Sequence, residues 1–235
     1  MSSLPNINAD LSQRIVLDTH AMEWEASPSG TVWRKPLYRE GGEFGAVTSL
    51  VRYQAGGQFH SHPHPQGEEI LVLEGEFCDN HGRYPTGSYL LNPEGSEHAP
   101  FSDEGCVLLV RLRQYAGTDR PQTHIDTRNS PWQQGMVDGL SVLPLYSQAG
   151  HAESMALVHW EAGTHFHQHS HPGGEEIFVL QGCFEDEHGS YSAGSWIRGP
   201  HMSVHKPFSR EGCLIYVRVG GLAPALDEKS PKAYF

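Results

Sequence analysis

Short apolar runs separated by turn residues recur along the whole chain. In the first half, the runs of strand length are residues 70–73, 87–91 and 106–112. In the second half, they are residues 177–180, 195–197 and 214–219. No window sustains the 3.6-residue apolar period of a helix. Many short strands at regular spacing predict an all-β sandwich or barrel.

The pattern occurs twice. About 30 of the 53 positions in residues 59–111 match the residue 107 positions further along. A repeat of this length predicts two tandem domains, each large enough for its own core. We place these domains at residues 15–114 and 123–220, joined by a link at 116–122 that contains Gly, Asp, Arg and Pro. The tail, 221–235, is expected to lie along a surface or to fray.

Charge and composition narrow the class of protein. The net charge is −12, and no run of five or more basic residues occurs. Neither a nucleic acid nor a membrane is therefore an expected partner. The apolar runs are far shorter than the roughly 18 residues that span a bilayer, and residues 1–14 lack the apolar core of a secretory signal. The cysteines form no C-x-x-C pair, so we expect a reduced, cytoplasmic protein with free thiols at Cys78, Cys106, Cys183 and Cys213.

Histidine and glutamate residues gather at the same place in both halves. The first set is His62, His64, Glu68 and His98. The second set, at the same offset throughout, is His169, His171, Glu175 and His205. Three neutral imidazoles and one carboxylate suit a divalent transition ion. We predict one metal site in each half, holding Zn(II), Fe(II) or Mn(II), because ligand softness does not separate these metals.

Strand geometry explains the spacing of the first set. Side chains alternate across a strand, so His62 and His64 point to the same face. A turn at residues 65–67 then brings Glu68 into the neighbouring strand. Glu69 would point the other way, so Glu68 is the predicted ligand. Ligands on separate strands of a barrel give a rigid site that does not need metal in order to fold.

Other polar residues have two interpretations each. His60 and His167 share strand parity with the ligands, and each is either a fourth imidazole or, as we favour, a polar residue outside the ligand set. Glu76, Arg111 and Arg218 could line a pocket, although ion pairs at strand ends explain them as well.

One position separates the two sites. Met202 stands in the second half where Gly95 stands in the first. A bulkier side chain beside His205 is predicted to narrow access to the second ion. The second site would then be the more structural of the two.

These residues carry a resemblance to the cupin superfamily. The first cupin motif, G-x5-H-x-H-x3-E-x6-G, is met at Gly56, His62, His64, Glu68 and Gly75, and again at Gly163, His169, His171, Glu175 and Gly182. The second motif, G-x5-P-x-G-x2-H-x3-N, is met at Gly87, Pro93, Gly95 and His98, with Ser102 replacing Asn. Its second copy has Gly194, Pro200 and His205, with Met202 and Ser209 replacing Gly and Asn. The resemblance covers nearly the whole chain and implies two tandem cupin barrels, each a double-stranded β-helix or jelly roll.

Four shorter motifs resemble the cupin-like domain of ChrR, an anti-sigma factor. They are Gly-Glu-Glu-Ile, Asp-x-His-Gly-x-Tyr, Ser-x-His-x-Pro-Phe-Ser and Glu-Gly-Cys. The resemblance implies a zinc ion held by three histidines and one glutamate, and a part in relaying an oxidative-stress signal. In that family a separate amino-terminal zinc module grips the sigma factor. Its H-x3-C-x2-C pattern does not occur here, so sigma-factor binding is not expected.

Two functions follow from these resemblances. The first is a metal-binding bicupin that acts as a stress-sensing or regulatory module. The alternative is a mononuclear non-haem Fe(II) dioxygenase that cleaves a small diketone or hydroxyaryl ketone, because the wider cupin group contains such enzymes. A storage or structural bicupin is less favoured, because such a protein does not need an intact set of metal ligands in both halves. A small-molecule ligand and a homodimer are compatible with either function.

Overall fold

In the computed structural model, which describes residues 4–27 and 30–222, nearly all regular structure is β-strand. This confirms the predicted all-β class. The short exceptions are two 3-10 helices, η1 (Thr19–Ala21) and η2 (Gly42–Phe44). Residues 223–235, most of the predicted tail, lie outside the described part of the chain. The chain forms two compact units: unit 1 is Met1–Ala9 with Met22–Ser130, and unit 2 is Asp10–Ala21 with Pro131–Phe235.

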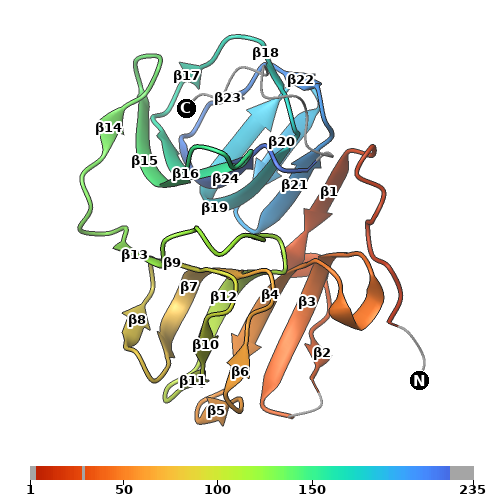
Figure 1. Ribbon diagram of the computed structural model, residues 1–235. Coiled ribbons are helices and arrows are strands. Elements are labelled where there is room, and N and C mark those ends of the chain that lie inside the picture. Colours follow the sequence, from red (N-terminus) through yellow and green to blue (C-terminus); the bar gives the residue numbers. More distant parts are fainter. Residues whose placement is uncertain (1–3, 28–29, 223–235) are drawn as a thin grey trace. The chain divides into compact units, whose positions relative to one another are not determined.

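Unit 1 is built from antiparallel strands of two to eleven residues. They are β2 (Glu25–Ala26), β3 (Val32–Arg39), β4 (Val47–Tyr53), β5 (Gly57–Gln58), β6 (His62–Pro63), β7 (Glu68–Cys78), β8 (Arg83–Pro85), β9 (Ser88–Asn92), β10 (Glu97–His98), β11 (Phe101–Ser102), β12 (Cys106–Leu112) and β13 (Thr123–Asp126). Figure 1 shows the main sheet, in the order β13-β9-β7-β12-β4-β3-β2. The pair β10-β6 forms a separate ribbon.

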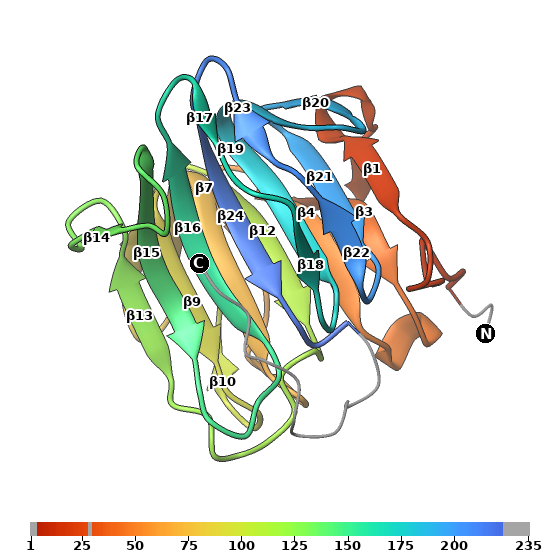
Figure 2. The ribbon, with the colours of Figure 1, turned by 90° about the horizontal axis from the view of Figure 1, so that it is seen from above.

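Unit 2 repeats this arrangement. Its strands are β1 (Ile15–Asp18), β14 (Gln133–Gln134), β15 (Leu140–Ser147), β16 (Ser154–Trp160), β17 (Thr164–His165), β18 (His169–His171), β19 (Glu175–Asp186), β20 (Gly189–Ser192), β21 (Ser195–Gly199), β22 (Ser203–His205), β23 (Phe208–Ser209) and β24 (Cys213–Val219). The main sheet has the order β1-β21-β19-β24-β16-β15-β14, which can be followed in Figure 2. The pair β18-β22 forms the separate ribbon.

The alternation of side chains gives each unit its own apolar core. In β7, Ile70 and Val72 face inward and are 1% exposed, and they pack in one cluster with Leu108 and Val110 of β12. Fully burying an aliphatic side chain of this size contributes about 1.5–3 kcal/mol. Unit 2 has the matching cluster, centred on residues of β16, β19 and β24. All six predicted apolar runs lie in or overlap strands of these sheets.

Two motif glycines are required by close backbone approach. Gly75 has a φ of 71°, and a Cβ added there would overlap the carbonyl oxygen of Gly105. Gly182 in unit 2 has a φ of 70° and meets Gly212 in the same way. Any other residue at either position would be strained and would push the neighbouring strand away.

Two strands depart from the sequence repeat. β1 precedes all of unit 1's strands, yet it pairs with β21 of unit 2, with Ile15 opposite Arg198. β13 comes after the link, yet it pairs with β9 of unit 1, with Thr123 opposite Leu91. The two units therefore exchange their first strands. The predicted domains, 15–114 and 123–220, follow the repeat and stay a prediction.

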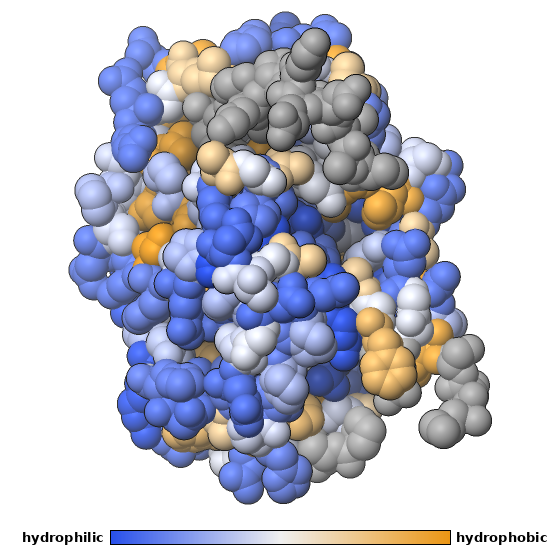
Figure 3. Space-filling model, in the orientation of Figure 1, coloured by the Kyte–Doolittle hydropathy of each residue, from blue (hydrophilic) through white to orange (hydrophobic). Residues whose placement is uncertain are grey.

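The surface is polar where it is drawn. The face drawn in Figure 3 is mostly hydrophilic. No helix in residues 4–27 and 30–222 is long and apolar enough to cross a membrane. All four cysteines are free thiols, as predicted.

Candidate metal centres and the cavity of unit 1

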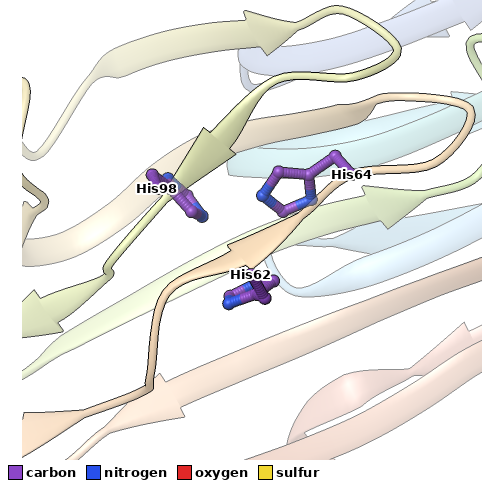
Figure 4. Close-up of side chains that lie close together, drawn as sticks. All are labelled: His62, His64 and His98. Atoms are coloured by element: carbon purple, nitrogen blue, oxygen red, sulfur yellow. The ribbon is translucent and has the colours of Figure 1, made fainter.

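Three histidines meet on the small ribbon of unit 1. His62 lies in β6 and pairs with His98 in β10, and His64 follows β6 directly. Figure 4 shows the three rings close together. Their candidate ligand nitrogens all lie within 4.8 Å of one another.

Unit 2 builds the same cluster on β18 and β22. His169 pairs with His205, and His171 completes the set. The ligand nitrogens again lie within 4.8 Å of one another, and the Nε2 atoms of His171 and His205 are 3.0 Å apart.

A buried glutamate lies against each cluster. The Glu68 Oε2 atom is 3.4 Å from Nε2 of His64 and 3.6 Å from Nε2 of His98. In unit 2, the Glu175 Oε2 atom is 3.5 Å from Nε2 of His171 and 3.7 Å from Nε2 of His205. The structure thus brings the eight residues singled out from the sequence into two groups of four. Glu69 points away, and its carboxylate lies 3.2 Å from the guanidinium of Arg111.

The chemistry of these groups fits a cation. The Nε2 atom of His64 is buried and has no hydrogen-bond partner among the described residues. Burial lowers the pKa of His64 and of His171 to about 3, so both imidazoles are neutral at pH 7. Burial also raises the pKa of Glu68 to about 7, because a carboxylate without a counter-ion is unfavourable there. A divalent ion would satisfy the nitrogen and stabilise the ionised carboxylate.

A hydrogen bond to a backbone carbonyl orients one imidazole in each cluster. Nδ1 of His62 lies 2.9 Å from the carbonyl oxygen of His60, and Nδ1 of His169 lies 3.0 Å from that of His167. A carbonyl oxygen only accepts, so Nδ1 donates and the Nε2 lone pair is left for a ligand bond.

An aspartate lies against a second imidazole in each cluster. Nδ1 of His98 lies 3.1 Å from Oδ2 of Asp79, and Nδ1 of His205 lies 3.6 Å from Oδ2 of Asp186. Burial raises the pKa of Asp186, but hydrogen bonds from His205 and Tyr191 outweigh it and lower the pKa to about 2. Both aspartates are therefore ionised acceptors at neutral pH.

Sequence reasoning missed these aspartates. They open the two Asp-x-His-Gly-x-Tyr turns, one of the motifs that resemble the ChrR cupin-like domain. The available signal was that Asp79 and Asp186 are separated by the same 107 positions as the histidines.

The two units differ in the space beside their clusters. Unit 1 has a cavity of about 410 Å³, bordered by His62, Glu68 and His98 and walled by aliphatic side chains of β4, β7 and β12. The corresponding cavity in unit 2 is about 60 Å³. Larger side chains fill the second barrel, with Trp160 and Leu140 at the positions of Tyr53 and Val32.

The remaining sequence interpretations have clear outcomes. His60 lines the mouth of the unit 1 cavity but is outside the cluster of ligand nitrogens. Arg111 and Arg218 lie in buried ion pairs, and Glu76 contacts Arg83, so the ion-pair interpretation holds for all three. Met202 is 52% exposed and is not among the residues that line the small cavity of unit 2, so the narrowing of access by its side chain stays a prediction.

Two antiparallel β barrels, each with three histidines and a glutamate gathered inside it, define a two-barrel cupin. The sequence profile of the ChrR cupin-like domain matches residues 12–116 and again residues 120–223. The chain therefore belongs to the family of ChrR cupin-like domains and carries two copies of that domain. A comparison with curated proteins gave no match.

Solved structures share the fold. A protein of Nostoc punctiforme, described provisionally as a dioxygenase, has a TM-score of 0.72 at 18% identity, over 88% of this chain and 82% of that one. Protein Ylba of E. coli has a TM-score of 0.72 at 14% identity, over 93% of this chain and 95% of that one. A cupin 2 conserved barrel domain protein of Leptotrichia buccalis has a TM-score of 0.62 at 11% identity, over 91% and 99%. The predicted fold of two tandem cupin barrels is confirmed.

Proposed function

We propose that the protein is a metal-dependent enzyme whose reaction takes place in unit 1, on a small organic molecule. Unit 2 would hold its ion mainly for structure. The reaction class that we favour is the Fe(II)-dependent, dioxygen-consuming cleavage of a small carbonyl or hydroxyaryl compound.

A single observation carries this proposal. The cavity of about 410 Å³ opens directly onto His62 and His98, whereas the otherwise similar cluster of unit 2 has about 60 Å³ beside it. Small-molecule sites are typically concave, mostly apolar and roughly 300–1,000 Å³ in volume. Among the residues that the structure describes, only those of unit 1 leave room for a substrate next to the candidate ligands.

The chain's own groups would have distinct tasks. His62, His64, His98 and Glu68 would hold the ion, and three neutral imidazoles with one carboxylate reduce the charge of a divalent ion to about +1. An ion bound there would supply Lewis acidity or, as Fe(II), redox chemistry with dioxygen. Ile70 and Leu108 on the cavity wall would exclude water and place the apolar part of the substrate against the site.

A regulatory metal-binding module is the second candidate. Unit 2 supports it, because a complete cluster is kept there with almost no space for a substrate. Such a module would bind two ions per chain and turn over no small molecule.

Metal analysis and oxygen uptake separate these functions. The protein, purified without chelator, would be analysed for iron, zinc and manganese. Uptake of dioxygen would then be measured after Fe(II) loading, with 1,3-diketones and hydroxyaryl ketones, each with and without a carboxylate group. Uptake that depends on both Fe(II) and substrate supports the enzyme, while two zinc ions without uptake support the module.

Matched histidine variants test the division of labour. His98→Ala should remove one of two ions and abolish uptake, because the two clusters share no residue. His205→Ala should also remove one ion but leave uptake largely intact. Two ions retained in His98→Ala would refute the ligand assignment, and loss of uptake in both variants would refute the division between units.

A further inference from the structure

An arginine side chain reaches the cavity of unit 1 beside the histidines. Arg34 lies two residues after buried Val32 in β3, so both side chains point to the same face of the sheet, and Arg34 lines the cavity. Its guanidinium carbon lies 5.6 Å from the centroid of the Phe59 ring. The same ring lies 6.3 Å from the His62 ring and 5.9 Å from the Tyr53 ring, between centroids. Arg34 and the candidate metal centre therefore share one wall residue.

Arg34 has no acidic partner among the described residues. Two other buried arginines do: Arg111 lies 3.2 Å from Glu69, and Arg218 lies 3.5 Å from Glu176. Burial lowers the pKa of Arg34 from its ordinary value, yet a guanidinium stays protonated at neutral pH. A partly buried cation without a counter-charge is unfavourable, so an anion entering the cavity would be stabilised there.

Two hydroxyl groups accompany Arg34. Ser49 is 2% exposed, lines the cavity, and its Oγ atom has no hydrogen-bond partner among the described residues. Tyr53 lines the same cavity, and burial raises the pKa of its phenol, which stays protonated. Each hydroxyl can donate one hydrogen bond to an oxygen anion. An unpaired buried hydroxyl is costly, and a bound ligand would offset that cost.

Unit 2 lacks the guanidinium and both hydroxyl groups at the matching positions. Arg34 lies opposite Val51 in unit 1, and the matching pair in unit 2 is Val142 opposite Val158. By the same register, Ala156 replaces Ser49 and Trp160 replaces Tyr53. The metal cluster and the barrel are kept in unit 2 without these groups. Neither the metal cluster nor the barrel fold therefore requires Arg34, Ser49 and Tyr53. Their presence in unit 1 points to a ligand that binds in that unit alone.

We propose that Arg34, Ser49 and Tyr53 form an anion-binding subsite that takes the carboxylate of a small organic acid, whose other end reaches the histidine cluster. A guanidinium fits a carboxylate with two parallel hydrogen bonds, which fixes orientation as well as affinity. The claim that this acid is the substrate rests on the proposed function. The claim that the subsite binds a carboxylate can be tested without turnover.

The test compares an acid with its uncharged amide. Zinc-loaded full-length protein, which cannot carry out iron chemistry, would be titrated calorimetrically with 2-hydroxybenzoate and with 2-hydroxybenzamide. The variants are Arg34→Val, which copies unit 2, and Arg34→Lys, which keeps the charge. Arg52→Gln is the control, because Arg52 lies 4.5 Å from the centroid of Trp24 and does not line the cavity.

Wild-type protein should prefer the acid by about tenfold or more, as expected for a charge-assisted pair. Arg34→Val should lose that preference, Arg34→Lys should keep part of it, and Arg52→Gln should keep all of it, with zinc content unchanged throughout. Equal affinity for acid and amide, no binding of the acid, or an intact preference in Arg34→Val would overturn the subsite. Acid preference without oxygen uptake would leave the subsite standing and refute only the enzyme.

Discussion

Asp79 and Asp186 each hold one histidine of a cluster through its Nδ1 atom. An ionised carboxylate accepts hydrogen bonds and cannot donate them, so the proton stays on Nδ1. In the neutral imidazole, the Nε2 lone pair then faces the cluster. At the scale of single residues, the aspartates therefore set both the orientation and the protonation of His98 and His205.

Replacing this acceptor should weaken metal binding in one unit. Asp79→Asn keeps the shape but removes the charge, and loss of such outer partners typically lowers metal affinity about 10- to 100-fold. Competition with a chromophoric chelator would show a weakened site in unit 1 and an unchanged site in unit 2. Asp186→Asn is the matched variant and should produce the reverse. Unchanged affinity at both sites in Asp79→Asn would contradict the orienting role.

Residues of the candidate centres were accessible from the sequence to different degrees. His62, His64 and Glu68 could be predicted because their spacing is local and occurs twice. Asp79 recurs as Asp186, but its contact with His98 could not be predicted, because Asp79 directly follows β7 and His98 lies in β10, and only the folded barrel brings them together. Arg34 was missed because a comparison of the two repeats draws attention to positions that are identical. Arg34 is informative because its equivalent in the second repeat, Val142, is a different residue.

At the scale of elements, β1 and β13 are the edge strands that complete the main sheets: β1 that of unit 2 and β13 that of unit 1. Thr19, which follows β1, donates its backbone N–H to Gly194 at 3.1 Å, and Thr127, after β13, donates to Gly87 at 3.0 Å. In an antiparallel ladder, hydrogen-bonded positions alternate. Leu17 and Ile125 are therefore the next donors.

Proline at these positions should destabilise opposite units. Leu17→Pro removes a ladder hydrogen bond to β21 and should lower the stability of unit 2 by about 1–3 kcal/mol. Metal release during urea unfolding, assigned to each unit with His98→Ala and His205→Ala backgrounds, would reveal which unit opens first. Ile125→Pro should instead weaken unit 1. If Leu17→Pro weakened unit 1, the exchange of strands would be refuted.

Strand positions illustrate what periodicity can and cannot predict. The run 106–112 agrees fully with β12, because a buried central strand has an uninterrupted apolar pattern. The partner of β1 was not predictable, since its exposed and half-buried residues alternate without specifying which sheet edge they meet. The sequence repeat by itself assigns β1 to the first domain.

At the scale of the whole molecule, each unit has an apolar core that includes no metal ligand. Binding energy from the ions is therefore added to a fold that is already stable, unlike in small zinc domains that unfold without metal.

Removing the ions should leave the β structure in place. After dialysis against chelator, circular dichroism should still report strands, while the melting temperature falls. Linkage predicts a loss of about 2.7 kcal/mol per site relative to protein with free metal about 100-fold above its Kd. Collapse of the β signal on chelation would contradict this, and restoring metal should return the original melting temperature.

The exchanged strands also dictate an order of events during synthesis. β13 leaves the ribosome after β9 and can close the sheet of unit 1 at once. β1 emerges near the start, but Ile15 must wait for Arg198. Until Arg198 has been synthesised, β1 has no partner strand, although unit 1 can already fold. A nascent chain interrupted in its last third would thus carry an orphan strand, a natural target for chaperones or for pairing with another chain.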